Sequence, residues 1–134
     1  MITICFLSLK GGTGKTTTVL NTGLNLKQMG YKVLLIDLDP AGYLATACGL
    51  TVKGRQSVAS LAHGASIRDL IQQSPIGIDM IPATPELNFM DVNEWMVDKK
   101  HLMRRNLQKL EYDVVLFDCN PSLNVINLQG LAAS

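Results

Sequence analysis

Near its amino terminus the chain reads Lys10-Gly11-Gly12-Thr13-Gly14-Lys15-Thr16-Thr17. The apolar run Ile2–Leu9 comes directly before this segment. A stretch suited to a helix, Lys15–Met29, follows it and stops before Gly30, a residue type common just after helix ends. We therefore expect a strand, a glycine-rich loop and a helix in immediate succession.

A glycine-rich loop between a strand and a helix is the setting of a phosphate-binding P-loop. Glycines let successive backbone N–H groups curl around phosphate oxygens without Cβ clashes, and the helix N-terminus adds partial positive charge. Lys15 can neutralise the β- and γ-phosphates, and the Thr16 hydroxyl can bind Mg²⁺. The usual motif has glycine where this chain has Leu9, and here Gly11 and Gly12 lie inside the loop instead. The alternative is a glycine-rich turn without a ligand.

The rest of the chain predicts one α/β domain over residues 1–134. Near-continuous runs rich in Ile, Val and Leu are typical of strands buried on both faces of a parallel sheet. The four predicted strands are Ile2–Leu9, Val33–Ile36, Ile78–Ile81 and Val114–Phe117. The predicted helices are Lys15–Met29, Val58–Ala62, Ile67–Ile71, Met96–Leu110 and Leu123–Ala133. Alternating strands and helices favour a parallel sheet with right-handed crossovers and flanking helices.

Carboxylates follow two of these runs. Asp37 and Asp39 come after Val33–Ile36, and Asp118 comes directly after Val114–Phe117. Ligands of open α/β sheets bind at the carboxyl edge of the strands, so these side chains are candidates for a nucleotide and metal site. Asp118 reads as a Walker B acid that holds Mg²⁺ through a water. The alternatives are that Asp37 and Asp39 cap the next turn, and that Asp118 only ends a core strand.

Composition excludes several classes of protein. The net charge is +1, so there is no global basic field for nucleic acid. The three cysteines form no C-x-x-C pair and read as reduced thiols of a cytosolic protein, with Cys119 facing the core. Met1–Leu9 is apolar but too short for a membrane span, and His63 and His101 read as surface residues. The basic residues of the 96–110 helix form a solvated face or, alternatively, a DNA or partner patch: Lys99, Lys100, Arg104, Arg105 and Lys109.

The loop resembles the deviant Walker A motif, K-G-G-x-G-K-[ST], of the ParA/MinD ATPases. Ile36-Asp37-Leu38-Asp39-Pro40 resembles the second motif of that family, and the run from Tyr112 to Leu123 its Walker B region. The resemblance covers the whole chain and is nearest the partition branch. Family members continue well beyond this length, so it implies a P-loop NTPase fold truncated at its carboxyl end.

The resemblance implies a role for each matching residue. The nucleotide-binding set is Gly11, Gly12, Thr13, Gly14, Lys15, Thr16 and Thr17; the metal set is Thr16, Asp37 and Asp118; the catalytic set is Lys10, Lys15 and Asp39. In the family, the first lysine of the loop reaches the nucleotide of the partner subunit. In this chain that lysine is Lys10. Asp39 would position the attacking water. The chain departs from the family pattern at Ala41, Tyr43 and Asn120; Asn120 replaces a proline and would loosen its loop.

The function implied is a slow Mg²⁺-dependent ATPase that dimerises around ATP and partitions plasmids, chromosomes or other cargo in the cytoplasm. The resemblance implies a ParB-like activating partner and no membrane binding. Non-specific DNA binding stays open, because the family's usual DNA-binding region lies outside this sequence. The alternative is a short paralogue that binds nucleotide, hydrolyses it poorly and acts as a regulatory or dimerising module.

Overall fold

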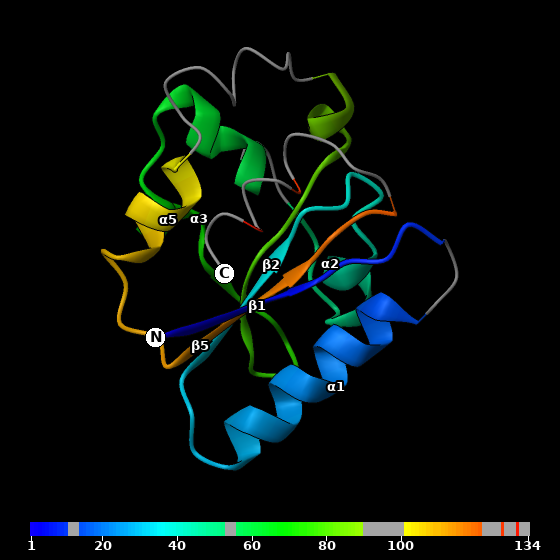
Figure 1. The fold of residues 1–134 in the computed structure, drawn as a ribbon, viewed down its shortest axis with the longest axis vertical. Helices are drawn as coiled ribbons and strands as arrows, with labels where there is room; N and C mark the ends of the chain where they lie inside the picture. Colours follow the sequence, from blue (N-terminus) through cyan, green and yellow to red (C-terminus); the bar gives the residue numbers. More distant parts are fainter. Residues whose placement is uncertain (11–13, 53–55, 90–100, 122–126, 128–130, 132–134) are drawn as a thin grey trace.

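The computed structural model describes residues 1–10, 14–52, 56–89, 101–121, 127 and 131. Five strands in these ranges form one sheet in the order β1-β5-β2-β4-β3 (Figure 1). Their bounds are β1 Ile2–Phe6, β2 Val33–Asp37, β3 Gln72–Gln73, β4 Asp79–Ile81 and β5 Val114–Asp118. All neighbouring strands are parallel except β3 and β4, which are antiparallel.

The four predicted strands are confirmed, and β2 and β5 are buried along their whole length. The fifth strand, β3, was not predicted, and it makes the sheet mixed rather than purely parallel. It consists of two glutamines joined to β4 by a tight turn, in which the Gly77 N–H donates to the Ser74 carbonyl at 2.8 Å. A polar pair of this length has no apolar periodicity to detect.

Helices cover both faces of the sheet (Figure 1). Helices α1 (Lys15–Gln28) and α2 (Tyr43–Ala47) pack on one face, with Val19, Leu44 and Cys48 in that core cluster. The other face is covered by the 3₁₀ helix η1 (Val58–His63), α3 (Ile67–Leu70) and α5 (Leu102–Leu107). A second 3₁₀ helix, η2 (Pro85–Phe89), follows β4. No helix in the described ranges is long and apolar enough to cross a membrane.

The predicted helices agree with the structure where it describes them. Helix α1 ends one residue early, before Gly30, whose φ of +97° breaks the helical path. The described part of Met96–Leu110 is helical over α5, with Met103 and Leu107 buried as expected. Residues 96–100 and most of Leu123–Ala133 lie outside the described residues. The short elements α2 and η2 were not predicted.

Strand β1 differs from the expected buried strand. It lies at one end of the strand order, pairs with β5, and ends at Phe6 rather than at Leu9. Ile2 and Ile4 are 63% and 39% exposed. The apolar run therefore predicted the strand correctly, but its first residues are more exposed than those of a strand buried on both faces.

Close packing of α1 on the sheet depends on Gly23. A Cβ at this buried glycine would lie 2.8 Å from Leu35 Cδ2 and 3.0 Å from Ile78 Cδ1. We predict that Gly23→Val lowers the free energy of unfolding by about 1–3 kcal/mol, measured by urea denaturation, because the added methyl groups overpack this contact. Asn21→Val, at an exposed position of the same helix, is the control and should have a much smaller effect. Equal losses in the two variants would contradict the packing argument.

Candidate nucleotide and magnesium site

The P-loop ends in a backbone geometry that favours glycine. Gly14 precedes the first residue of α1 with a φ of +79°, and its carbonyl accepts hydrogen bonds from the Thr18 N–H at 2.9 Å and the Thr18 hydroxyl at 2.8 Å. No side chain caps this helix end in the described structure. The first-turn N–H groups of Lys15, Thr16 and Thr17 are therefore available to an anion. Gly11, Gly12 and Thr13 lie outside the described residues.

Two carboxylates meet at the carboxyl edge of the sheet, as the sequence predicted. Asp37 and Asp118 are register partners at the ends of β2 and β5. Their exposed fractions are 0% and 1%. The Thr16 hydroxyl donates a 2.6 Å hydrogen bond to Asp118 Oδ2. That bond joins the start of α1 to the end of β5 and brings three predicted metal ligands to one place.

Each of these acids has one oxygen satisfied and one without a partner. The Asp39 N–H donates to Asp37 Oδ1 at 2.9 Å. Asp37 Oδ2 and Asp118 Oδ1 are buried and have no hydrogen-bond partner among the described residues. A buried oxygen without a partner is costly, and hard oxygen donors are what Mg²⁺ prefers. The residues present therefore fit a magnesium ion or its bound water.

Burial governs the protonation of this pair. Desolvation raises the pKa of Asp37 well above its usual range, and the nearby carboxylates of Asp118 and Asp39 raise it further. Desolvation also raises the pKa of Asp118, while the Thr16 hydrogen bond and the Lys15 ammonium lower it. A divalent cation between the two acids would favour their charged forms.

Asp39 lies beside this centre, and Lys10 lies at the start of the loop. The Asp39 carboxylate is half-buried, and its Oδ1 accepts the Ala41 N–H at 2.9 Å. The turn-capping alternative is thus correct for one oxygen of Asp39 and for Asp37 Oδ1. Lys10 is exposed at the start of the loop, where its N–H donates to the Ser8 hydroxyl at 3.3 Å. Tyr43, where the chain departs from the family pattern, is 66% exposed.

The loop after β5 has a restraint that sequence reasoning missed. The side-chain amide of the buried Asn127 donates to the Asn120 carbonyl at 3.0 Å and to Asn120 Oδ1 at 2.6 Å. Asn120 was expected to loosen this loop because it replaces a proline. The structure instead shows Asn120 held by two hydrogen bonds. Two asparagines seven residues apart give no local signal of such a pairing.

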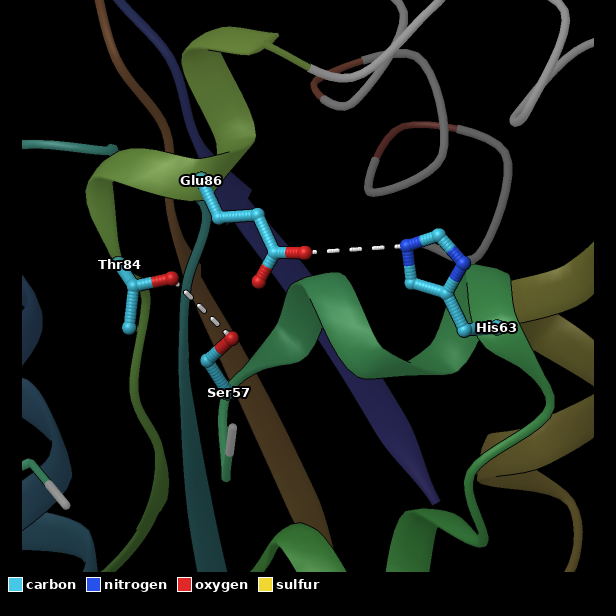
Figure 2. Close-up of polar contacts among 4 residues, drawn as sticks. All are labelled: Ser57, His63, Thr84 and Glu86. Carbon is cyan, nitrogen blue, oxygen red and sulfur yellow. Dashed lines mark hydrogen bonds and ion pairs between the residues drawn. The ribbon is translucent and has the colours of Figure 1, made fainter. Parts of the chain in front are cut away.

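Four further polar residues among those the structure describes, Ser57, His63, Thr84 and Glu86, make contacts in pairs. Figure 2 shows the His63 imidazole pointing toward Glu86, and the Ser57 hydroxyl toward Thr84. The His63–Glu86 distance is 3.8 Å, and both side chains are about half exposed. The Ser57 and Thr84 hydroxyls are 3.3 Å apart. Ser57 and His63 thus do not form a nucleophile and base pair, and His63 is a surface residue as predicted.

This geometry places the chain among P-loop nucleotide-binding proteins. An AAA domain family model, AAA_31, matches residues 1–134. The chain belongs to this family and corresponds to the N-terminal half of a ParA-type P-loop ATPase.

One relative in sequence and two solved structures illustrate the similarity. The chain is 36% identical to the chromosome-partitioning ATPase Soj of Treponema pallidum, over 98% of this chain and 53% of Soj. It matches the structure of cobyrinic acid a,c-diamide synthase from Mycobacterium smegmatis, with bound ATP analogue and magnesium, at a TM-score of 0.92 and 34% identity, covering 100% of this chain and 55% of the synthase. A plasmid partition protein from Borrelia burgdorferi matches at a TM-score of 0.86 and 27% identity, covering 99% of this chain and 61% of that one. The chain spans about half the length of the curated relatives it matches.

The raised pKa values of Asp37 and Asp118 predict a pH dependence of stability. An unfolded aspartate ionises near pH 4, whereas the folded protein keeps these protons to higher pH. The free energy of unfolding should therefore fall as pH rises from about 4 through the folded pKa values. Asp118→Asn keeps an acceptor for Thr16 and removes one charge. We predict that its stability relative to wild type is greater near pH 7.5 than near pH 4.5, as measured by urea denaturation without Mg²⁺.

Asp69→Asn changes an exposed carboxylate on α3 and serves as the control for this experiment. Its stability relative to wild type should vary little between the two pH values. A stability difference for Asp118→Asn that is independent of pH would contradict the electrostatic account.

Proposed function

We propose that this chain forms the Mg²⁺-ATP site of a ParA-type partitioning ATPase. The 2.6 Å Thr16–Asp118 hydrogen bond, beside two buried carboxylate oxygens without partners, is the observation that most supports this proposal. This hydrogen bond joins a helix N-terminus, which can bind phosphate, to carboxylate oxygens, which can bind a divalent cation. The relatives named as partitioning ATPases and the magnesium-bound structural match support the same assignment.

Each residue of the site has a defined part in the proposed reaction. Lys15 and the first-turn N–H groups bind the β- and γ-phosphates, while Thr16 and Asp118 hold Mg²⁺ with support from Asp37. When bound, Mg²⁺ neutralises charge that develops on the phosphate oxygens. Asp39 orients the attacking water. Lys10 of one subunit supplies positive charge to the nucleotide of the partner subunit, in the manner of an arginine finger.

In the proposed cycle ATP joins two copies of the protein and hydrolysis separates them. Hydrolysis is slow and is stimulated by a ParB-like partner in the cytoplasm. The second candidate is a module that binds nucleotide but hydrolyses it poorly. The departures at Ala41 and Tyr43 favour this second candidate. Phosphate release, with and without DNA, distinguishes the two.

Lys15→Ala tests the P-loop assignment directly. Removing the ammonium that faces the phosphates should weaken Mg²⁺-ATP binding at least about tenfold in calorimetry, because a charge-assisted contact is lost. Lys27→Ala, an exposed lysine in the last turn of the same helix, is the matched control and should bind ATP like wild type. If the two variants bind ATP equally well, the assignment is wrong.

Asp39→Ala tests the role of the water-orienting carboxylate. We expect this variant to keep Mg²⁺-ATP affinity and to lose about a hundredfold or more in single-turnover hydrolysis, because a group that positions water acts mainly in the transition state. Asp39 also caps the turn at Ala41, so Asp39→Asn, which keeps that acceptor, is the control for turn structure. Asp39→Asn should be as inactive as Asp39→Ala. Full activity in Asp39→Asn would assign Asp39 a structural role only.

Lys10→Ala tests the contact across the dimer. The variant should bind ATP as a monomer with unchanged affinity and form the ATP-bound dimer at least about tenfold less well, because the lost charge acts on the partner's nucleotide. Sedimentation with a non-hydrolysable ATP analogue measures this equilibrium. Undiminished dimerisation of Lys10→Ala would exclude a cross-subunit role for this lysine.

A further inference from the structure

Two cysteines that the nucleotide site does not use lie in contact beside it. Cys5 is in β1, and Cys119 directly follows Asp118 at the end of β5. Their Sγ atoms are 2.9 Å apart, and both are free thiols. Cys5 is half-buried, whereas Cys119 is 1% exposed. Sequence spacing gave no hint of this pair, because 114 residues separate its members.

The parallel register of β1 and β5 brings these thiols together. Cys5 pairs with Phe117, so Cys5, Phe117 and Cys119 lie on the same face of the sheet. The Cys119 N–H donates to the Phe6 carbonyl at 3.2 Å, which keeps the chain after β5 against β1. A disulfide bond is about 2.05 Å long, so the sulfurs need to approach by less than about 1 Å.

The third cysteine, Cys48, lies on the other face of the sheet from this pair. Cys48 is fully buried, directly follows α2 and belongs to the core cluster on that face. It lies apart from the pair and serves as an internal control for thiol chemistry.

We propose that Cys5 and Cys119 form a reversible oxidation site that closes to a disulfide between β1 and the end of β5. With a peroxide as oxidant, the Cys5 sulfur attacks one peroxide oxygen, the O–O bond breaks, and Cys5 becomes a sulfenic acid with release of water. The Cys119 sulfur then attacks Cys5 Sγ, the S–O bond breaks, and the hydroxyl leaves as a second water with the Cys119 proton. Two thiols are oxidised and one peroxide is reduced to two waters. A thiol reductant reverses the step.

The position of the pair links oxidation to the nucleotide site. Strand β1 leads into the P-loop, and Cys119 adjoins Asp118, whose Oδ2 accepts the Thr16 hydrogen bond. Formation of the disulfide draws the backbone after Asp118 toward β1 and so changes the position of the Asp118 carboxylate. Oxidation should therefore weaken Mg²⁺-ATP binding by roughly tenfold, the scale of a disturbed outer-shell contact. This second part rests on the proposed function, whereas the disulfide itself does not.

The test is oxidation of the reduced full chain with one equivalent of hydrogen peroxide, followed by intact mass and peptide mapping without reduction. We expect a monomer that is lighter by about 2 Da, with a Cys5–Cys119 cross-linked peptide, and recovery of the original mass with dithiothreitol. The titratable thiols in denaturant should fall from three to one. Cys48→Ala should behave like wild type. Cys5→Ala and Cys119→Ala should each lose the cross-link. In these variants the two remaining cysteines should stay as thiols or gain oxygen.

The proposal is overturned if Cys5→Ala or Cys119→Ala still loses about 2 Da, if the products are only disulfides between chains, or if oxygen addition is the only change. Calorimetry with Mg²⁺-ATP separates the two parts. Equal binding by the reduced and oxidised chains overturns the link to the nucleotide site but leaves the oxidation site intact. Absence of binding by the reduced chain overturns the proposed function, while the cross-link still supports the oxidation site.

Discussion

Two acids at the same register position of neighbouring buried strands, Asp37 and Asp118, set the main constraint on this structure. Desolvation opposes the charged form of both acids, Asp118 repels the charge of Asp37, and Asp39 repels both. The surroundings offset this cost with the Thr16 hydroxyl, the Asp39 N–H and the charge of Lys15. Two carboxylate oxygens remain without partners. A bound cation is the natural complement to these oxygens, and the rest of the fold can be understood as the frame that holds them in place.

The frame consists of the most buried parts of the chain. Strands β2 and β5 are buried from end to end, and their apolar side chains alternate between the α1–α2 face and the face covered by η1, α3 and α5. Burial of two faces of a parallel sheet supplies the stabilisation that offsets the cost of burying these acids. Helix α1 packs closely at Gly23 and so directs its first turn, with Thr16, toward the strand ends. The packing of the core therefore determines the geometry of the site.

Long, strongly patterned elements could be predicted from the sequence, whereas contacts that follow from no such pattern could not. Strands β2 and β5, helix α1, and the meeting of Asp37 with Asp118 follow from apolar runs and from the shared carboxyl edge of parallel strands. The two glutamines of β3 have no such pattern, and the apolar run of β1 does not show that Ile2 and Ile4 are exposed. The Asn120–Asn127 and Cys5–Cys119 contacts depend on where distant segments come to lie. The one available signal for the cysteines is the parallel register of the strands that hold them.

The central claim is that Thr16 and Asp118 form a divalent cation site that a nucleotide completes. Electron paramagnetic resonance with Mn²⁺ in place of Mg²⁺ measures this directly, because the signal of free Mn²⁺ is lost when the ion binds. We expect ADP to promote Mn²⁺ binding to the wild-type chain and Asp118→Asn to weaken that binding at least about tenfold. Mn²⁺ binding that is the same in wild type and Asp118→Asn, at equal ADP occupancy, would contradict the central claim.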